Sequence, residues 1–307
     1  MPPRSPLPQR DGLDAAWLRT PDNDPDTVPR WTTMRDFLLD RLPEIAPVEE
    51  MLVAREFVDH AGRAWIGDDP YRPNSFVWFH RYLLPEPVVP FPIEILYRDE
   101  RILVVDKPHF LATTPRGTHV RESVLVRLRA SLGLPDLAPA HRLDRLTAGV
   151  LVLTTDRCHR AAYAGLFQSG AVRKTYEALA PADPDRTFPQ RIGNRIEKRR
   201  GSLQAEIVPG LPNAETLIEV VETRAQHARY RLTPTTGKTH QLRVHLNVLG
   251  LPILGDPLYP TVRDVDPADF TNPLQLVARR LSFIDPIDRA PREFTSGFAL
   301  EWPARAE

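Results

Sequence analysis

The N-terminal quarter of the chain alternates between polar stretches and short apolar segments. Residues 34–42 carry apolar side chains three and four positions apart, a spacing typical of one helix face, and Pro43 ends the run. A second short helix is predicted within residues 48–57, and the segments 64–67 and 75–79 are expected to form short strands. The pattern therefore predicts a small unit in which two helices precede two strands.

The rest of the chain contains both the three-to-four-residue spacing of helices and the two-residue alternation of strands. Helical spacing predicts helices over residues 123–132, 157–168 and 239–249, the last capped by Thr239 and followed by Gly250. Apolar runs and two-residue alternation predict strands over residues 102–105, 150–153, 172–178, 217–221 and 229–232. Alternation places Lys174 and Tyr176 on the same face of their strand. This order favours an α+β fold: a mixed, largely antiparallel sheet with peripheral helices.

Composition divides the chain into four parts. Residues 1–30 are rich in Pro, Asp and Arg and poor in apolar side chains, which predicts a flexible tail. Residues 31–84 are the small domain. Prolines recur over residues 85–92, and because proline fixes φ and lacks a backbone donor, we expect a stiff, extended linker there. Residues 93–307 form the larger domain.

Composition also narrows the class of protein. The chain has 307 residues, of which 42% are hydrophobic, and no apolar run approaches the roughly 20 residues needed to cross a bilayer. Its first residues lack the continuous apolar stretch of a secretory signal. The single cysteine, Cys158, excludes an internal disulfide and a cysteine-based metal cluster. We expect a soluble, cytoplasmic and monomeric protein, with neither a membrane nor a metal as partner.

Charge is unevenly distributed although the net charge is zero. Residues 1–90 hold 10 basic and 15 acidic side chains, whereas residues 91–307 hold 30 basic and 25 acidic ones. The larger domain is therefore the basic one, which suits a polyanionic partner. Most of its basic residues are arginines, which can grip phosphate and stack on bases, although genomic base composition explains the same bias.

The most informative segment is HRLDRLTAG, residues 141–149. It places Asp144 between Arg142 and Arg145, so the approach of either cation would favour the ionised carboxylate. Gly149 permits a turn or a close backbone approach that other residues resist. From spacing alone, a surface turn with an ordinary ion pair is the more common explanation of this segment.

The segment resembles the HRLDxxTSG motif of the RluA-type pseudouridine synthases. Two further blocks follow in the order and at roughly the distances of that family: RKTY at residues 173–176 and GKTHQLRVH at residues 237–245. Residues 102–108 match the family's opening strand and Lys-Pro turn, and residues 255–259 match a further recurrent piece. The resemblance covers about two thirds of the chain, and Ala148 stands where the family usually has Ser.

The resemblance implies a role for each block. Asp144 would be the catalytic nucleophile, and Arg243 would pair with it and keep it ionised. Tyr176 would stack on the target uracil and could act as a base near the ribose. Arg142 would fill the space left by a uridine that has moved out of its stack. A central cleft along the sheet would hold RNA.

The same blocks contain further candidate RNA-binding residues, namely Lys174, His141 and Lys238. For His141 and also His245, hydrogen bonds to the backbone of the motifs are a simpler explanation than proton transfer. The run at residues 195–200 is either a basic loop that grips phosphate or a solvated turn. The small domain would be a degenerate form of the RNA-binding domain first known from ribosomal protein S-four, although its acidic balance argues against RNA binding.

The implied function is isomerisation of specific uridines to pseudouridine in structured RNA, either ribosomal or transfer RNA. The reaction needs no metal or cofactor if a carboxylate attacks or stabilises the sugar, as in a retaining glycosidase. Attack at the sugar and assisted elimination both remain open. Two rival functions are a carboxylate-dependent nucleoside or glycoside hydrolase, which needs a second acid, and an RNA-binding clamp without activity.

Overall fold

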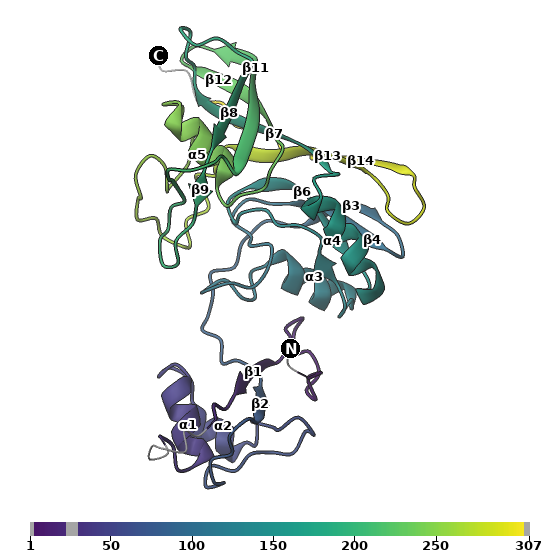
Figure 1. Ribbon diagram of the computed structural model, residues 1–307, viewed down its shortest axis with the longest axis vertical. Helices are drawn as coiled ribbons and strands as arrows, with labels where there is room; N and C mark the ends of the chain where they lie inside the picture. Colours follow the sequence, from purple (N-terminus) through teal and green to yellow (C-terminus); the bar gives the residue numbers. More distant parts are fainter. Residues whose placement is uncertain (1–2, 23–29, 304–307) are drawn as a thin grey trace. The chain divides into compact units, whose positions relative to one another are not determined.

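The computed structural model describes residues 3–22 and 30–303, and Figure 1 follows the chain through its helices and strands. The chain folds into two compact units, Met1–Pro85 and Glu86–Glu307. The boundary between them lies within residues 85–92, the segment in which prolines recur.

The N-terminal unit consists of two short helices and a two-stranded antiparallel sheet. These elements are α1 (Met34–Arg41), α2 (Val48–Val53), β1 (Ala16–Arg19) and β2 (Phe76–Phe79). Thr33 begins α1 because its hydroxyl accepts a hydrogen bond from the Asp36 N–H, while the Asp36 carboxylate accepts one from the Thr33 N–H. Apolar side chains from both helices and both strands form the core, including Met34, Phe37, Leu38, Met51, Leu52, Val77 and Phe79.

Two predictions for this unit are wrong. The flexible tail predicted for residues 1–30 contains β1, whose pairing with β2 satisfies its backbone groups and buries Ala16; residues 1–2 and 23–29 lie outside the described residues. Ala64, in the predicted strand 64–67, forms an isolated bridge with Val58 instead. A strand as short as β1 is fixed by a partner some sixty residues later, and no local pattern reveals that partner.

The C-terminal unit is organised around one large sheet. Its strands are β3 (Glu94–Arg98), β4 (Ile102–Lys107), β5 (Ala138–Pro139), β6 (Ala148–Thr154), β7 (Arg173–Pro181), β8 (Gln190–Asn194), β11 (Ala214–Arg224), β12 (His227–Pro234), β13 (Leu276–Ile284) and β14 (Pro291–Thr295). The main order is β3-β4-β6-β13-β7-β12-β11-β8; β5 pairs with β6 and β14 with β13. Only the β6–β13 pair is parallel among these described strands. The predicted α+β class with a mixed, largely antiparallel sheet is confirmed.

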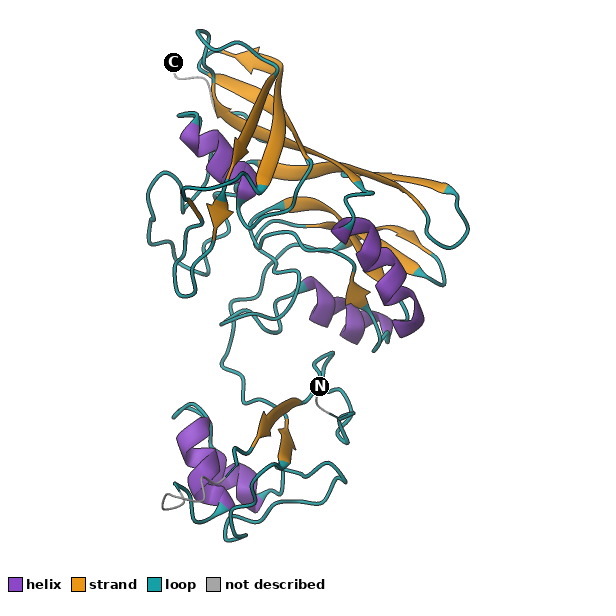
Figure 2. Cartoon of the chain, in the orientation of Figure 1, coloured by secondary structure: helices purple, strands orange, loops and turns teal. Residues whose placement is uncertain are grey.

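A separate ribbon consists of two strands, β9 (Ile196–Glu197) and β10 (Glu206–Ile207). The basic run at residues 195–200 includes β9 and continues into the connection between the two strands. The helices are α3 (Val124–Leu132), a short 3-10 turn (Arg157–His159), α4 (Arg160–Gln168) and α5 (Gln241–Val248). Figure 2 shows α3 and α4 near the β3–β4–β6 end of the sheet and α5 near the β8–β11–β12 end. The predicted peripheral helices are therefore all present.

The start of α5 differs from its prediction. Thr239 does not cap this helix; the cap residue is His240, which has a φ of +58° and makes no side-chain capping bond. Leu242 and Leu246 are buried as the spacing predicts, and Gly250 follows the helix with a φ of +77°. The left-handed conformation of His240 turns the preceding segment sharply into the helix, so residues 237–240 face the site described below.

The residues that lead into the sheet belong to the C-terminal unit. The Glu86 carboxylate accepts hydrogen bonds from the backbone N–H groups of Val120, Arg121 and Glu122. Val89 is buried, and its N–H donates to the Glu122 carboxylate. Most of the segment predicted as a linker is therefore fastened to the C-terminal unit.

Candidate active site

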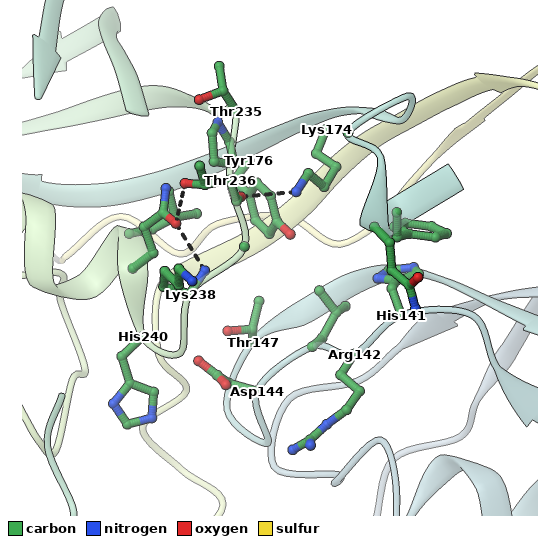
Figure 3. A pocket seen from close by; sticks show the side chains of 18 of the residues that line it. His141, Arg142, Asp144, Thr147, Lys174, Tyr176, Thr235, Thr236, Lys238 and His240 are labelled. Carbon is green, nitrogen blue, oxygen red and sulfur yellow. Dashed lines mark hydrogen bonds between the residues drawn. The ribbon is translucent and has the colours of Figure 1, made fainter. Parts of the chain in front are cut away.

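A hollow of about 750 Å³ is formed by the loop that precedes β6, by β7 and by the turn that leads into α5. Figure 3 shows its side chains from close by. All seven residues for which a site role was predicted line it: His141, Arg142, Asp144, Lys174, Tyr176, Lys238 and Arg243. The structure thus brings together three blocks that are separated by up to a hundred residues.

Asp144 lies in the loop between β5 and β6, and this loop is held by its backbone. The Thr113 hydroxyl donates to the Leu143 carbonyl at 2.8 Å and accepts from the Leu143 N–H at 3.1 Å. The Thr147 N–H donates to the Asp144 carbonyl at 3.1 Å. The Asp144 carboxylate itself has no hydrogen-bond or ion-pair partner within residues 3–22 and 30–303, and Figure 3 shows it between Thr147 and His240. It is an acceptor left open to the hollow.

Lys107 supports the same loop from below, a role that the sequence did not reveal. Its fully buried ammonium donates to the carbonyls of Pro108, Leu111 and Arg145 at 2.9, 2.8 and 3.1 Å. Burial lowers the pKa of Lys107 to about 7, while the negative charge of Asp144 acts in the opposite direction. The available signal was a lysine at the end of a buried strand that begins with four apolar residues.

Arg243 is buried, with 2% of its surface exposed, but it does not pair with Asp144 as expected. Its guanidinium binds Asp256 in a two-pronged manner, with Nε–Oδ2 at 2.8 Å and Nη2–Oδ1 at 2.6 Å. Burial lowers the pKa of Arg243, but the hydrogen bond and charge of Asp256 outweigh that effect and raise it, with a smaller contribution from Asp144. The prediction of a direct pair is wrong because the turn after Gly255 presents a better carboxylate.

Tyr176 and Lys174 project from β7 into the hollow, as their alternation predicts. The Lys174 ammonium donates to the Thr236 carbonyl at 3.1 Å, and burial lowers the pKa of Lys174. Burial and then the negative charge of Asp144 raise the pKa of Tyr176. The phenol is therefore protonated at neutral pH and lies within the electrostatic reach of Asp144.

The histidines of the motifs are partly or fully buried, and burial favours their neutral form. His141 stacks on Phe167, with ring centroids 4.2 Å apart, and its Nε2 accepts from the Val152 N–H at 3.2 Å. Burial lowers the pKa of His141 to about 3. The predicted backbone bond is thus confirmed for His141 but wrong for His245, whose Nδ1 contacts the Thr216 hydroxyl at 2.9 Å. The His141 ring forms part of the wall of the hollow.

A second hollow of about 630 Å³ adjoins the first. The two share Arg142, Leu143, Asp144, Gly237, Lys238, His240 and Arg243. Arg142 and Lys238 are exposed, and Figure 3 shows Arg142 extending away from Tyr176. His240, which no role was predicted for, contacts the Tyr259 hydroxyl at 3.0 Å, and burial lowers its pKa to about 4. Asp144 therefore lies where the two hollows meet.

Comparisons with known proteins show the family of the chain. Residues 101–248 match the model of the RNA pseudouridylate synthase family. The chain is 31% identical over 212 residues to the dual-specificity RNA pseudouridine synthase RluA of Vibrio parahaemolyticus, covering 63% of this chain and 78% of that protein. It is 33% identical over 193 residues to an RNA pseudouridine synthase of Synechocystis sp., covering 62% of this chain and 66% of that protein.

A solved structure extends the comparison to the fold. Human RNA pseudouridylate synthase domain containing 1 aligns with a TM-score of 0.54 at 25% identity, covering 70% of this chain and 86% of that one. The sheet of the present chain and its Asp144 carboxylate, which borders two hollows, place the molecule among the RNA-modifying enzymes that isomerise uridine. The chain belongs to the RNA pseudouridylate synthase family and, within it, to the RluA-type enzymes.

Two features bear on cofactors and membranes. In the part of the chain that the structure describes, no cluster of three or more His, Cys, Asp or Glu side chains is arranged to hold a metal ion. Within the same residues, no helix is both long and apolar enough to span a bilayer.

Proposed function

We propose that this enzyme converts specific uridines of ribosomal or transfer RNA to pseudouridine with Asp144 as the nucleophile. The observation that carries the proposal is the Asp144 carboxylate, which is open to the hollow while the loop that presents it is fixed by Thr113 and Lys107. A carboxylate without internal partners keeps its lone pairs for the substrate.

The reaction balances without a cofactor. The N1–C1′ bond of uridine breaks, the base turns, and a C5–C1′ bond forms. The hydrogen on C5 leaves as a proton and N1 gains one, so nothing is oxidised or reduced. Asp144 either bonds to C1′ or assists elimination across the ribose, and in both routes a carboxylate meets a developing positive charge at the sugar.

The other side chains around Asp144 shape the hollow and contact the base. Arg243, fixed by Asp256, forms a rigid part of the wall beside Asp144. Tyr176 offers its ring to the uracil, a contact worth about 1–3 kcal/mol. Its raised pKa favours the neutral phenol, which supports stacking over a role as base in the resting enzyme. Arg142 is exposed at the mouth and free to replace the displaced base.

The hydrolase alternative requires a second carboxylate that is free to act as an acid or base. Asp256 is the acidic residue next to Arg243, but its oxygens are occupied by Arg243 and by the N–H groups of Leu258 and Tyr259. This arrangement favours the isomerase. Lys174 and Lys238 would contact the RNA at the rim, and we expect the N-terminal unit to assist as an S-four-like helper in a monomeric, cytoplasmic enzyme.

The test uses RNA labelled with tritium at C5 of uridine and prepared from cells that lack this protein. Ribosomal and transfer fractions are incubated separately with the wild type and with Asp144→Asn. We expect the wild type to release tritium from at least one fraction and Asp144→Asn to lose at least about 10³-fold in rate, as for removal of other nucleophiles.

Each component of the result decides something different. Release from one fraction identifies the class of RNA. Release of free uracil would indicate hydrolysis instead. Full activity of Asp144→Asn, or no release from any fraction while RNA binding is retained, would overturn the proposed function.

A further inference from the structure

The second hollow differs from the first in its charge. Three cationic side chains line it that do not line the first hollow, Arg116, Arg145 and Lys198, in addition to the shared Arg142 and Lys238. Asp144 is the sole carboxylate among the lining residues, and Arg243 is already neutralised by Asp256. The hollow therefore carries a clear excess of positive charge.

These cations lack the carboxylate partners that most arginines of this unit have. Elsewhere in the sheet, Arg229, Arg279 and Arg292 each form ion pairs. For Arg116, Arg142 and Arg145, by contrast, no ion pair occurs with any described residue. Positive charge that is left without a partner around a concave surface points to an anionic ligand.

Lys198 is held in place by its own hairpin. It follows β9, and its ammonium donates to the carbonyls of Ser202 and Gln204, the latter at 3.4 Å. Burial lowers the pKa of Lys198, and the positive charge of Arg116 lowers it further. Two like charges from segments eighty residues apart are thus brought near each other, and a bound anion would relieve their repulsion.

The geometry of a nucleotide would place its base in one hollow and its phosphates in the other. The base and the phosphates are attached at different ends of the ribose. With the ribose at Asp144 and the uracil beside Tyr176 in the first hollow, the backbone must leave the ribose on another side. Tyr176 lines only the first hollow, whereas Arg116 and Lys198 line only the second.

We propose that the second hollow is a phosphodiester subsite, in which Arg116, Arg145 and Lys198 bind the RNA backbone next to the target uridine. This inference rests on the proposed function because it places the ribose at Asp144. It also assigns the basic run at residues 195–200 a role in gripping phosphate, the first of the two explanations that the sequence left open. Phosphate contacts of this kind set the register of the RNA without reading its sequence.

The experiment measures how binding depends on salt. A fluorescent oligouridylate of ten nucleotides is titrated with the full-length enzyme at several KCl concentrations, for the wild type, Arg116→Gln and Arg116→Gln/Lys198→Gln. For single-stranded nucleic acid, each lost phosphate contact reduces the slope of log K against log salt by about 0.7. We therefore expect reductions of about 0.7 for the single variant and about 1.4 for the double variant.

Two controls make the result specific. Arg289→Gln removes an exposed arginine outside both hollows and should leave the slope unchanged. A methylphosphonate oligouridylate, which has a neutral backbone, should bind equally well to the wild type and the double variant. Because the Arg116 side chain makes no hydrogen bond to a described residue, the single variant tests the subsite even if Lys198→Gln disturbs the hairpin.

An unchanged slope for Arg116→Gln, or an equal loss of affinity for the neutral probe, would overturn the subsite. Tritium release by the wild type is measured on the same preparations. A reduced slope without tritium release supports backbone binding in the second hollow but rejects the proposed function and, with it, the place of a target uridine at Asp144. Tritium release with an unchanged slope rejects only the subsite.

Discussion

Two segments that border the active site hold their carboxylates in opposite ways. In the loop before β6, Asp144 has a fixed backbone and a carboxylate without a partner among the described residues. In the turn after Gly255, Asp256 is buried, and it accepts from Arg243 and from two backbone N–H groups. The contrast separates a carboxylate that is free to bind a ligand from one that supports the fold.

The most direct test of this difference between Asp144 and Asp256 is to neutralise each carboxylate in turn and to measure the free energy of unfolding. Asp256→Asn leaves the buried Arg243 without a counter-charge and should cost about 3–5 kcal/mol in the free energy of unfolding. Asp144→Asn removes a charge that has no partner and should change that free energy by no more than about 0.5 kcal/mol. Hydrogen exchange of the α5 amides measures the stability of the C-terminal unit directly.

A double variant tests whether the Asp256 effect comes from the unpaired charge. Arg243→Met/Asp256→Asn contains no buried charge at this place and should recover part of the stability that Asp256→Asn loses, without recovering activity. Equal stability of the single and double variants would show that the backbone bonds of Asp256, and not its pairing with Arg243, support the turn.

Much of this site could be predicted from the sequence, for a physical reason. The motif blocks encode local structure that presents one side chain each, so Asp144, Tyr176 and Lys174 appear where spacing and resemblance place them. The partner of Arg243 could not be predicted, because it depends on how the turn at residues 255–259 packs against α5. The second hollow depends on a hairpin and a loop that meet only in the folded chain.

Each segment also adjoins a glycine that is pressed against another strand or loop. A Cβ on Gly149, which has a φ of +119°, would lie 2.4 Å from the Ala278 carbonyl oxygen of β13. A Cβ on Gly255, with a φ of +73°, would lie 2.4 Å from the Pro273 carbonyl oxygen. The close approach expected at Gly149 is therefore confirmed, and Gly255 provides the same contact in the other segment.

Alanine at either glycine should destabilise the unit by about 2–4 kcal/mol, because backbone strain is added to a steric clash. Gly133→Ala is the matched control: its φ is +65°, but a Cβ there would have no neighbour within 4 Å. It should cost only about 1–2 kcal/mol, the strain of the left-handed conformation. Similar losses at all three positions, measured by urea unfolding followed by circular dichroism, would show that the contacts with β13 and Pro273 do not matter.

The smallest expected effect concerns His245, which packs against β11 from helix α5. His245 is fully buried on α5, its Nδ1 contacts the Thr216 hydroxyl, and burial lowers its pKa from 6.5 to about 4. Between these two pH values the unfolded chain binds a proton at this histidine and the folded chain does not. Folding stability therefore falls as the pH is lowered from about 6.5 to about 4, by about 2 kcal/mol at pH 4.5 for this residue alone.

The variant His245→Gln tests this effect, because glutamine cannot titrate. In urea unfolding, its loss of folding stability between pH 7 and pH 4.5 should be smaller than that of the wild type by the same amount. The same pH dependence in the variant and the wild type would mean that the acid sensitivity arises elsewhere, for instance at His141 or His240, whose pKa values burial also lowers.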